Sequence, residues 1–418
     1  MSAGGPGGWL PLPDHLQTRA GNVDPFDWFN ERRAAGAVQW CPDRGCWDVF
    51  TYDAAERVLS DPETFANEPL VGENATFKDT LLGLDPPEHT RKRGIVESHF
   101  RPEAVRDHED DIRATARQLL ADGFDGRRGT ADVVSSFAYP LPISTIAGLL
   151  GAPPDIREEL KAVSDDAIAS PDLAGADDVE SFLAEQGEAV MEIGDLVSDV
   201  IDEKRENPGD DLISDLLAAD HGLSYYELLR LCGLLIVAGH VTTTNLIANT
   251  VWCLAERPAA FDQAREAALA GDDAALARLV EEVVRFRSPA QMAARVATED
   301  VTVAGADIAA GDPVITWIQA ANRDPAVFDD PNTFDPARDP NPNIGFGRGP
   351  HSCLGVHLAK LEGRVAAEEL LSSVSSLSLV ETTYEPVEAP FLHGVQALPV
   401  RYERPPDADT GTDAARTG

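Results

Sequence analysis

The chain of 418 residues is poor in basic side chains, and in lysine above all. It has 34 lysine and arginine residues, of which only five are lysine, against 72 aspartate and glutamate residues, so its formal net charge is −38. The acidic residues are dispersed along the chain and are not gathered in a tail. A surface of this charge repels phosphate backbones and anionic lipid headgroups. We therefore expect neither nucleic acid nor an anionic membrane as a partner.

The acidic surplus has two interpretations. One is adaptation to high salt, where screening removes the self-repulsion that would loosen the fold in dilute buffer. The other is an ordinary acidic cytosolic enzyme. The composition alone leaves both open.

Cysteine is also scarce. The five cysteines are an odd number and are widely scattered, so they form no disulfide framework, and we expect a reduced, cytoplasmic location. Cys41 and Cys46 can face each other across a short turn, but two ligands do not make a zinc site.

Long uninterrupted apolar runs are absent. The first 16 residues have neither a basic segment nor an apolar core, so we expect no secretion signal and no membrane anchor. The most apolar stretch, 228–255, is interrupted by His240, three threonines and Asn245, which favours a buried core helix. With 43% hydrophobic residues the chain can bury a substantial core.

The most informative stretch is 346–355, with the sequence FGRGPHSCLG. It places Cys353 in a glycine-rich turn immediately before a helical pattern, where unpaired backbone N–H groups and the helix dipole favour a thiolate. The glycines Gly347, Gly349 and Gly355 let the backbone approach a flat, bulky group, against which Phe346 can pack. Such a thiolate suits haem iron, whereas a lone cysteine in a turn is more often simply buried.

The pattern Phe-x-x-Gly-x-x-x-Cys-x-Gly resembles the haem-binding signature of the cytochrome P-450 family of haem-thiolate monooxygenases. The resemblance implies a mainly α fold with a smaller β portion, with haem b between a long central helix and the cysteine loop. It makes Cys353 the metal ligand. It also implies that His351, two residues before the thiolate, faces a haem propionate.

Two further segments match the propionate-binding parts of this family. The helix opened by Pro86-Pro87-Glu88 carries His89 and Arg93 four residues apart, and hence on one face. Taken alone, this pair is more simply a solvated basic face, but the segment resembles the family helix whose His and Arg hold a propionate. Arg295, in the strand after Pro289, resembles a second propionate ligand.

The central helix, predicted to start at Ser224, contains Ala238-Gly239-His240-Val241-Thr242. This resembles the family's oxygen-binding kink, Ala-Gly-x-acid-Thr. The resemblance implies that Ala238 and Gly239 let the helix pass close to the haem and that Thr242 bonds dioxygen and helps to deliver protons. Alternatively, Thr242 merely bonds the carbonyl of residue i−4, as mid-helix threonines often do.

One position departs from the family pattern, because Val241 replaces the acid and cannot relay a proton. Three interpretations remain. Protons can arrive through Thr242 and water, which we favour, or through a polar group on the substrate. Otherwise the protein uses peroxide in place of dioxygen.

A structural motif completes the resemblance. Glu282 and Arg285 are three residues apart on a predicted helix and can pair. Glu-x-x-Arg is weak evidence alone, but in the family this pair locks to an arginine of the later meander, here Arg338. The triad holds the cysteine loop in shape.

The resemblance covers nearly the whole chain and implies one catalytic domain over 1–404, and we expect a disordered tail over 405–418. It implies insertion of one oxygen atom from O2 into a small organic substrate. No segment resembles a flavin or iron–sulfur domain, so we expect electrons from a separate ferredoxin-type donor and its reductase. Arg91, Lys92, Arg348 and Lys360 are the predicted docking residues. A peroxide-driven peroxygenase and a non-catalytic haem sensor are the alternatives.

Overall fold

The computed structural model describes residues 12–67, 79–153, 159–160, 163 and 179–406. The sequence also predicts loops at 61–84 and 170–178; residues 68–78 of the first, all of the second and most of the predicted tail at 405–418 lie outside the described ranges. The described chain is mainly helical with smaller sheets, as predicted.

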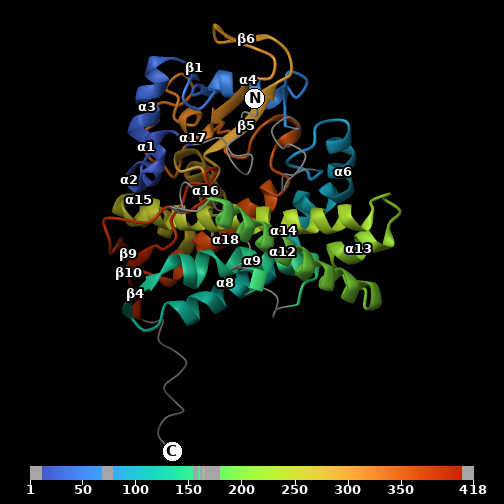
Figure 1. Ribbon diagram of the computed structural model, residues 1–418. Coiled ribbons are helices and arrows are strands. Elements are labelled where there is room, and N and C mark those ends of the chain that lie inside the picture. Colours follow the sequence, from blue (N-terminus) through green and yellow to red (C-terminus); the bar gives the residue numbers. More distant parts are fainter. Residues whose placement is uncertain (1–11, 68–78, 154–158, 161–162, 164–178, 407–418) are drawn as a thin grey trace, which may run out of the picture.

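Helices form the larger part of the molecule (Figure 1). They are α1 (Asp14–Gln17), α2 (Arg19–Val23), α3 (Phe26–Ala35), α4 (Tyr52–Ser60), α6 (Glu88–Val96), α7 (Pro102–Arg106), α8 (Glu109–Gly123), α9 (Pro140–Leu150), α12 (Val179–Glu206), α13 (Leu212–Ala218), α14 (Tyr225–Ala255), α15 (Pro258–Ala270), α16 (Asp273–Phe286), α17 (Ile318–Ala321) and α18 (Val356–Ser373). Short helical turns occupy Glu97–Phe100, Val134–Ala138 and Gly349–His351.

The strands make three sheets in the described part of the chain. They are β1 (Val38–Cys41), β2 (Cys46–Val49), β3 (Phe65–Ala66), β4 (Arg128–Asp132), β5 (Met292–Ala297), β6 (Val301–Val303), β7 (Ala306–Ile308), β8 (Pro313–Trp317), β9 (Ser376–Leu379) and β10 (Pro399–Glu403). The largest sheet has the order β1-β2-β8-β5-β3, in which only β2 and β8 are parallel. The others have the orders β4-β10-β9 and β6-β7.

Helix α14 is the centre of the helical half, where it packs against α9, α12, α16 and α18 (Figure 1). It begins where the sequence predicts, because Ser224 and Glu227 form a reciprocal capping box. Among the described helices it alone is long and apolar enough to cross a bilayer, yet 72% of its most apolar window is buried inside the fold. It is therefore a core helix, as its polar interruptions indicate.

The predicted hairpin and strands are present. The pattern over 38–50 predicts a hairpin around the Asp43-Arg44-Gly45 turn, and Val38–Cys41 and Cys46–Val49 pair as an antiparallel hairpin there. Strands predicted at 301–303 and 313–317 are β6 and β8, whereas β5 extends three residues beyond the strand predicted at 291–294. Helix starts are shifted slightly. The helix expected to be capped by Asp53 begins at Tyr52, with Thr51 as its N-cap.

Candidate active site

Cys353 lies at the end of a tight loop whose conformation requires glycine. Gly347 and Gly349 have φ of 72° and 68°, in the left-handed region that other residues rarely adopt. A side chain on Gly349 would also collide with the backbone of Leu59 and Ser60 at the end of α4. The Cys353 N–H donates to the carbonyl oxygen of Phe346 at 2.8 Å, which closes the loop before α18 starts.

The thiol of Cys353 is accessible to solvent from a cavity, although it lies deep in the fold. Burial raises its pKa, and the Gly355 N–H, Arg93 and Lys360 offset only part of this effect. In the polypeptide alone, burial thus outweighs the neighbouring groups that lower the pKa of this thiol. A metal ion bound to the sulfur would supply the missing stabilisation, because coordination deprotonates a thiol outright.

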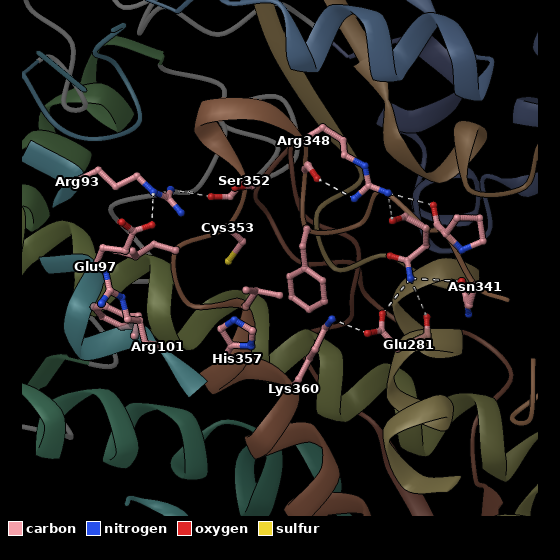
Figure 2. Close-up of a pocket in the computed structure, with 17 residues that line it drawn as sticks. Arg93, Glu97, Arg101, Glu281, Asn341, Arg348, Ser352, Cys353, His357 and Lys360 are labelled. Carbon is pink, nitrogen blue, oxygen red and sulfur yellow. Dashed lines mark hydrogen bonds and ion pairs between the residues drawn. The ribbon is translucent and has the colours of Figure 1, made fainter. Parts of the chain in front are cut away.

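A cavity of about 600 Å³ opens at Cys353. Figure 2 shows Arg93, Glu97 and Arg101 on one side of it, Arg348, Asn341 and Glu281 on the other, and His357 and Lys360 along α18. We call its four strongly basic lining residues the basic bowl: Arg93, Arg101, Arg348 and Lys360.

The basic bowl carries a surplus of positive charge on a very acidic protein. Its four cations face two carboxylates of the lining, Glu97 and Glu281. Lys360 pairs with Glu281 at 2.5 Å and Arg93 lies 3.7 Å from Glu97. Exposed Arg101 has no carboxylate within ion-pair distance in the described structure.

Two of the predicted docking residues lie elsewhere. Arg91 is exposed and forms an ion pair with Glu88 at 2.7 Å, and neither lines the cavity. Lys92 is buried and reaches Glu227 at the start of α14, 2.9 Å away. The sequence placed both at the docking surface because of their proximity in the chain, but helical geometry turns them away from Arg93.

A second basic cluster brings together the predicted propionate ligands His89, Arg295 and His351. The rings of His89 and His351 are 4.1 Å apart, and Asn67 Nδ2 lies 2.7 Å from His351 Nε2. Asp85 is the nearby carboxylate, 3.7 Å from His351 Nε2. No sequence pattern marks Asn67, which approaches His351 only through the fold.

The cluster has unmet capacity for an anion. Buried His89 has a pKa lowered to about 4, first by burial and then by His351 and Arg93. Its Nδ1 has no hydrogen-bond partner among the described residues. Burial lowers the pKa of Arg295 to about 10, against the opposite effect of Asp85, and Arg295 donates to the carbonyl of Ala294 at 2.7 Å. An orphaned imidazole nitrogen and a buried guanidinium fit the carboxylates of a haem.

Arg93 connects this cluster to the cysteine loop. It lies one turn after His89 on α6, and its Nη1 donates to the carbonyl oxygen of Ser352 at 2.7 Å. This bond holds Ser352, the residue before Cys353, against α6.

The predicted oxygen-binding residues on α14 differ in their exposure to solvent. Ala238 is exposed and Thr242 is half-buried, although their neighbours in the middle of the helix are mostly buried. Thr242 Oγ1 donates to the carbonyl oxygen of Ala238 at 3.2 Å, the i−4 bond that the sequence left as an alternative.

Gly239 has a different reason for being small. A Cβ at this position would lie 2.8 Å from Cγ1 of Ile146, so the missing side chain lets α14 pack against α9. Packing of α14 on α9 is thus one structural reason for a glycine at this position.

Val241 and His240 both point away from solvent. Val241 packs in an apolar cluster with Ala389 and Leu392. The His240 Nδ1 bonds the carbonyl of Ile236 at 2.8 Å and its ring meets Tyr139 edge-on, while burial lowers its pKa to about 4. A proton relay from either residue thus has no support in these contacts.

The structure also brings together the three predicted structural residues. Arg285 grips the Glu282 carboxylate with two nitrogens at 2.7 and 2.8 Å, and both residues are fully buried. Arg338 Nε adds a bond of 3.1 Å. Because Arg285 also donates to carbonyls of the segment 322–333, this triad ties α16 to the chain leading into the cysteine loop.

Comparison with known proteins agrees with this architecture. The sequence profile for cytochrome P450 matches residues 178–394. The chain is 35% identical to the putative cytochrome P450 YjiB of Bacillus subtilis (strain 168), over 90% of this chain and 93% of that protein. It is 36% identical to the erythromycin C-12 hydroxylase of Saccharopolyspora erythraea, over 88% and 91% of the two chains.

Solved structures show the same likeness. The crystal structure of CYP109E1 from Bacillus megaterium in complex with testosterone superposes with a TM-score of 0.85 at 34% identity, covering 92% of this chain and 99% of that one. The chain belongs to the cytochrome P450 family. It is a cytochrome P450 monooxygenase, and membership of this family implies a haem cofactor.

Proposed function

We propose that the protein is a haem b-dependent monooxygenase that inserts one oxygen atom from O2 into a hydrophobic organic substrate, with electrons from a separate donor. The observation that supports it best is that Arg93, which lines the cavity at Cys353, lies one helical turn from buried His89, whose Nδ1 has no hydrogen-bond partner among the described residues. Cys353 would ligate the iron, and the haem would supply activation of dioxygen. His89, Arg93, Arg295 and His351 would hold the propionates.

The absorption spectrum of the dithionite-reduced, carbon monoxide-bound protein, recorded in high salt, tests the ligand. A strongly red-shifted Soret band is expected for the cysteine thiolate. A band typical of histidine- or thiol-ligated haem that persists at molar KCl would contradict the proposal. Cys353→Ser, which keeps the loop closed through its backbone, should lose the shifted band.

The apolar cluster of Val241, Ala389 and Leu392 supports a hydrophobic substrate. Relatives fit this class, because one is named for erythromycin hydroxylation and another is solved with testosterone. A screen of apolar compounds for spin-state changes would find candidate substrates. Spin-state responses confined to small polar compounds would refute this class.

We further propose that the electron donor is an acidic, ferredoxin-type protein, supplied with electrons by its reductase, that docks on the basic bowl. Charge complementarity speeds such encounters and makes them sensitive to salt. Arg101 is the sharpest test position, because it is exposed and has no carboxylate partner in the described structure. Arg101→Glu should slow reduction by the ferredoxin and flatten its salt dependence.

The matched control is Arg91→Glu, since Arg91 has the same charge, is also exposed and lies outside the cavity. Equal slowing by both variants would indicate a general charge effect and would refute a specific role of the bowl. An unchanged rate for Arg101→Glu would refute docking at this site.

Proton delivery is proposed to use the Thr242 hydroxyl and water, because Val241 is apolar and packed. Thr242→Val should lower the ratio of product to oxygen consumed, and Val241→Glu should raise turnover and coupling. If Val241→Glu changed nothing, the relay would lie elsewhere.

A peroxide-driven peroxygenase is the second candidate, and the apolar packing of Val241 is the observation that favours it. Hydrogen peroxide brings its own protons, so an acid at this position is dispensable. Product formed faster with peroxide than with ferredoxin and O2 would support this candidate. We also propose one catalytic domain over 1–404 and a cytoplasmic location, which the scarcity of cysteine favours.

A further inference from the structure

The β1–β2 hairpin, far along the chain from Cys353, places two cysteines opposite each other. Cys41, the last residue of β1, is the register partner of Cys46, the first residue of β2. Register partners in an antiparallel pair have their Cα atoms about 4.5–5.5 Å apart, and their side chains share one face. Disulfides span Cα separations of about 4.4–6.8 Å. The backbone therefore already has the spacing that a disulfide needs.

The side chains of Cys41 and Cys46 share one apolar environment. Both belong to the apolar cluster formed by Phe29, Phe50 and Trp317, in which Cys46 is fully buried and Cys41 is partly buried. One cysteine is thus accessible to a small oxidant, while its partner is shielded.

Arg44, in the turn, adds a fixed positive charge at this position. It is held by Asp48, whose two carboxylate oxygens lie 2.7 and 2.9 Å from Nη1. Burial lowers the pKa of Arg44, but Asp48, Cys46 and Cys41 together raise it by more, which places both sulfurs near the guanidinium.

We propose that Cys41 and Cys46 form a reversible redox modification site, oxidised by hydrogen peroxide to an intra-hairpin disulfide. The Cys41 sulfur attacks one peroxide oxygen and becomes a sulfenic acid, with release of one water. The Cys46 sulfur then attacks the Cys41 sulfur, and its proton leaves with the sulfenic hydroxyl as a second water. Two thiols are oxidised, and one peroxide is reduced to two waters.

The fold allows this reaction without disturbing the core. β1 is the edge strand of its sheet, so only its pairing with β2 must adjust. Two other cysteines, Cys232 and Cys253, are fully buried in the core of the helical half. Neither lies opposite another cysteine on a paired strand. Burial raises the pKa of Cys46 to about 12, so the more accessible Cys41 is the cysteine that meets peroxide first.

The sequence provides a direct test, because Arg44 lies between the two cysteines. Trypsin cuts after Arg33, Arg44 and Arg57, so the reduced, alkylated chain yields separate peptides 34–44 and 45–57. The holoenzyme is treated with hydrogen peroxide, quenched with iodoacetamide, denatured and digested. We expect the two peptides to be joined, with the loss of two hydrogens, and to separate on reduction.

Cys41→Ser should abolish the joined species, whereas Cys253→Ala, which removes a cysteine elsewhere, should leave it intact. The proposal is overturned if peroxide leaves both cysteines alkylated, or if Cys41 proceeds to sulfinic acid without the link. It is also overturned if Cys46 pairs with another cysteine. All of these outcomes are read from the peptides and do not depend on catalytic activity.

Discussion

Glu362 of α18 offers the sharpest test of the energetics. The Glu362 side chain is fully buried, and one of its carboxylate oxygens has no hydrogen-bond partner in the described chain. Burial raises the pKa of this carboxyl to about 8, although a hydrogen bond to Thr145 acts in the opposite direction. The folded state therefore keeps a proton that the unfolded chain, with an ordinary pKa of 4.5, releases at neutral pH.

The sign follows from proton linkage. Below about pH 4.5 both the folded and the unfolded state bind the proton, so ionisation of Glu362 does not lower stability. The free energy of unfolding falls as the pH rises from there to about 8, where the loss is complete. Each pKa unit between the two states is worth about 1.4 kcal/mol, so the ceiling is about 5 kcal/mol. Because the structure relaxes around the charge, we expect a measured loss of stability of a few kcal/mol.

Glu362→Gln keeps the shape and removes the titration. Compared with the parent holoenzyme at high KCl, the variant should be of similar stability at pH 5 and more stable at pH 8, as read from urea midpoints. Glu188→Gln, at an exposed site, is the control and should show no such trend. A difference between variant and parent that stays constant from pH 5 to pH 8 would refute a raised folded-state pKa.

Three further outcomes are expected. Gly239→Val should destabilise the protein by about 1–3 kcal/mol, because the new side chain collides with Ile146. The double variant Gly239→Val, Ile146→Ala should recover part of that loss in urea unfolding, and no recovery would show that the collision is elsewhere. Arg285→Met leaves the Glu282 carboxylate buried without its bidentate partner, and should cost about 3–5 kcal/mol and lower the haem content of purified protein. If the acidic surface is a salt adaptation, the melting temperature should rise between low and molar KCl, and an unchanged value would dismiss it.

Local signals in the sequence were enough for much of the fold. The capping residue Ser224, the hairpin around the Asp43-Arg44-Gly45 turn and the strand at Pro313–Trp317 all lie where the pattern predicts them. These features are determined by neighbours in the chain, which explains why they can be read without the structure.

Side-chain directions were less predictable. The orientation of Lys92 toward Glu227, and the closeness of Gly239 to Ile146, both depend on partners more than 90 residues away. The raised pKa of Cys353 likewise results from burial in the assembled fold, which no local pattern reports.

Helix α14 is held by side-chain contacts near both ends, and several side chains bond to its backbone carbonyls at its centre. At its start Glu227 is held by Lys92, and near its end Trp252 is packed against Tyr384 and the Arg287 guanidinium. Between them, the carbonyls of residues 238, 239 and 241 each accept a side-chain bond from a residue four positions later. Such competition for backbone acceptors softens a helix and favours bending there. The backbone of α14, about 46 Å long and held by side-chain contacts near both ends, is therefore expected to bend most readily at the turn that carries Thr242.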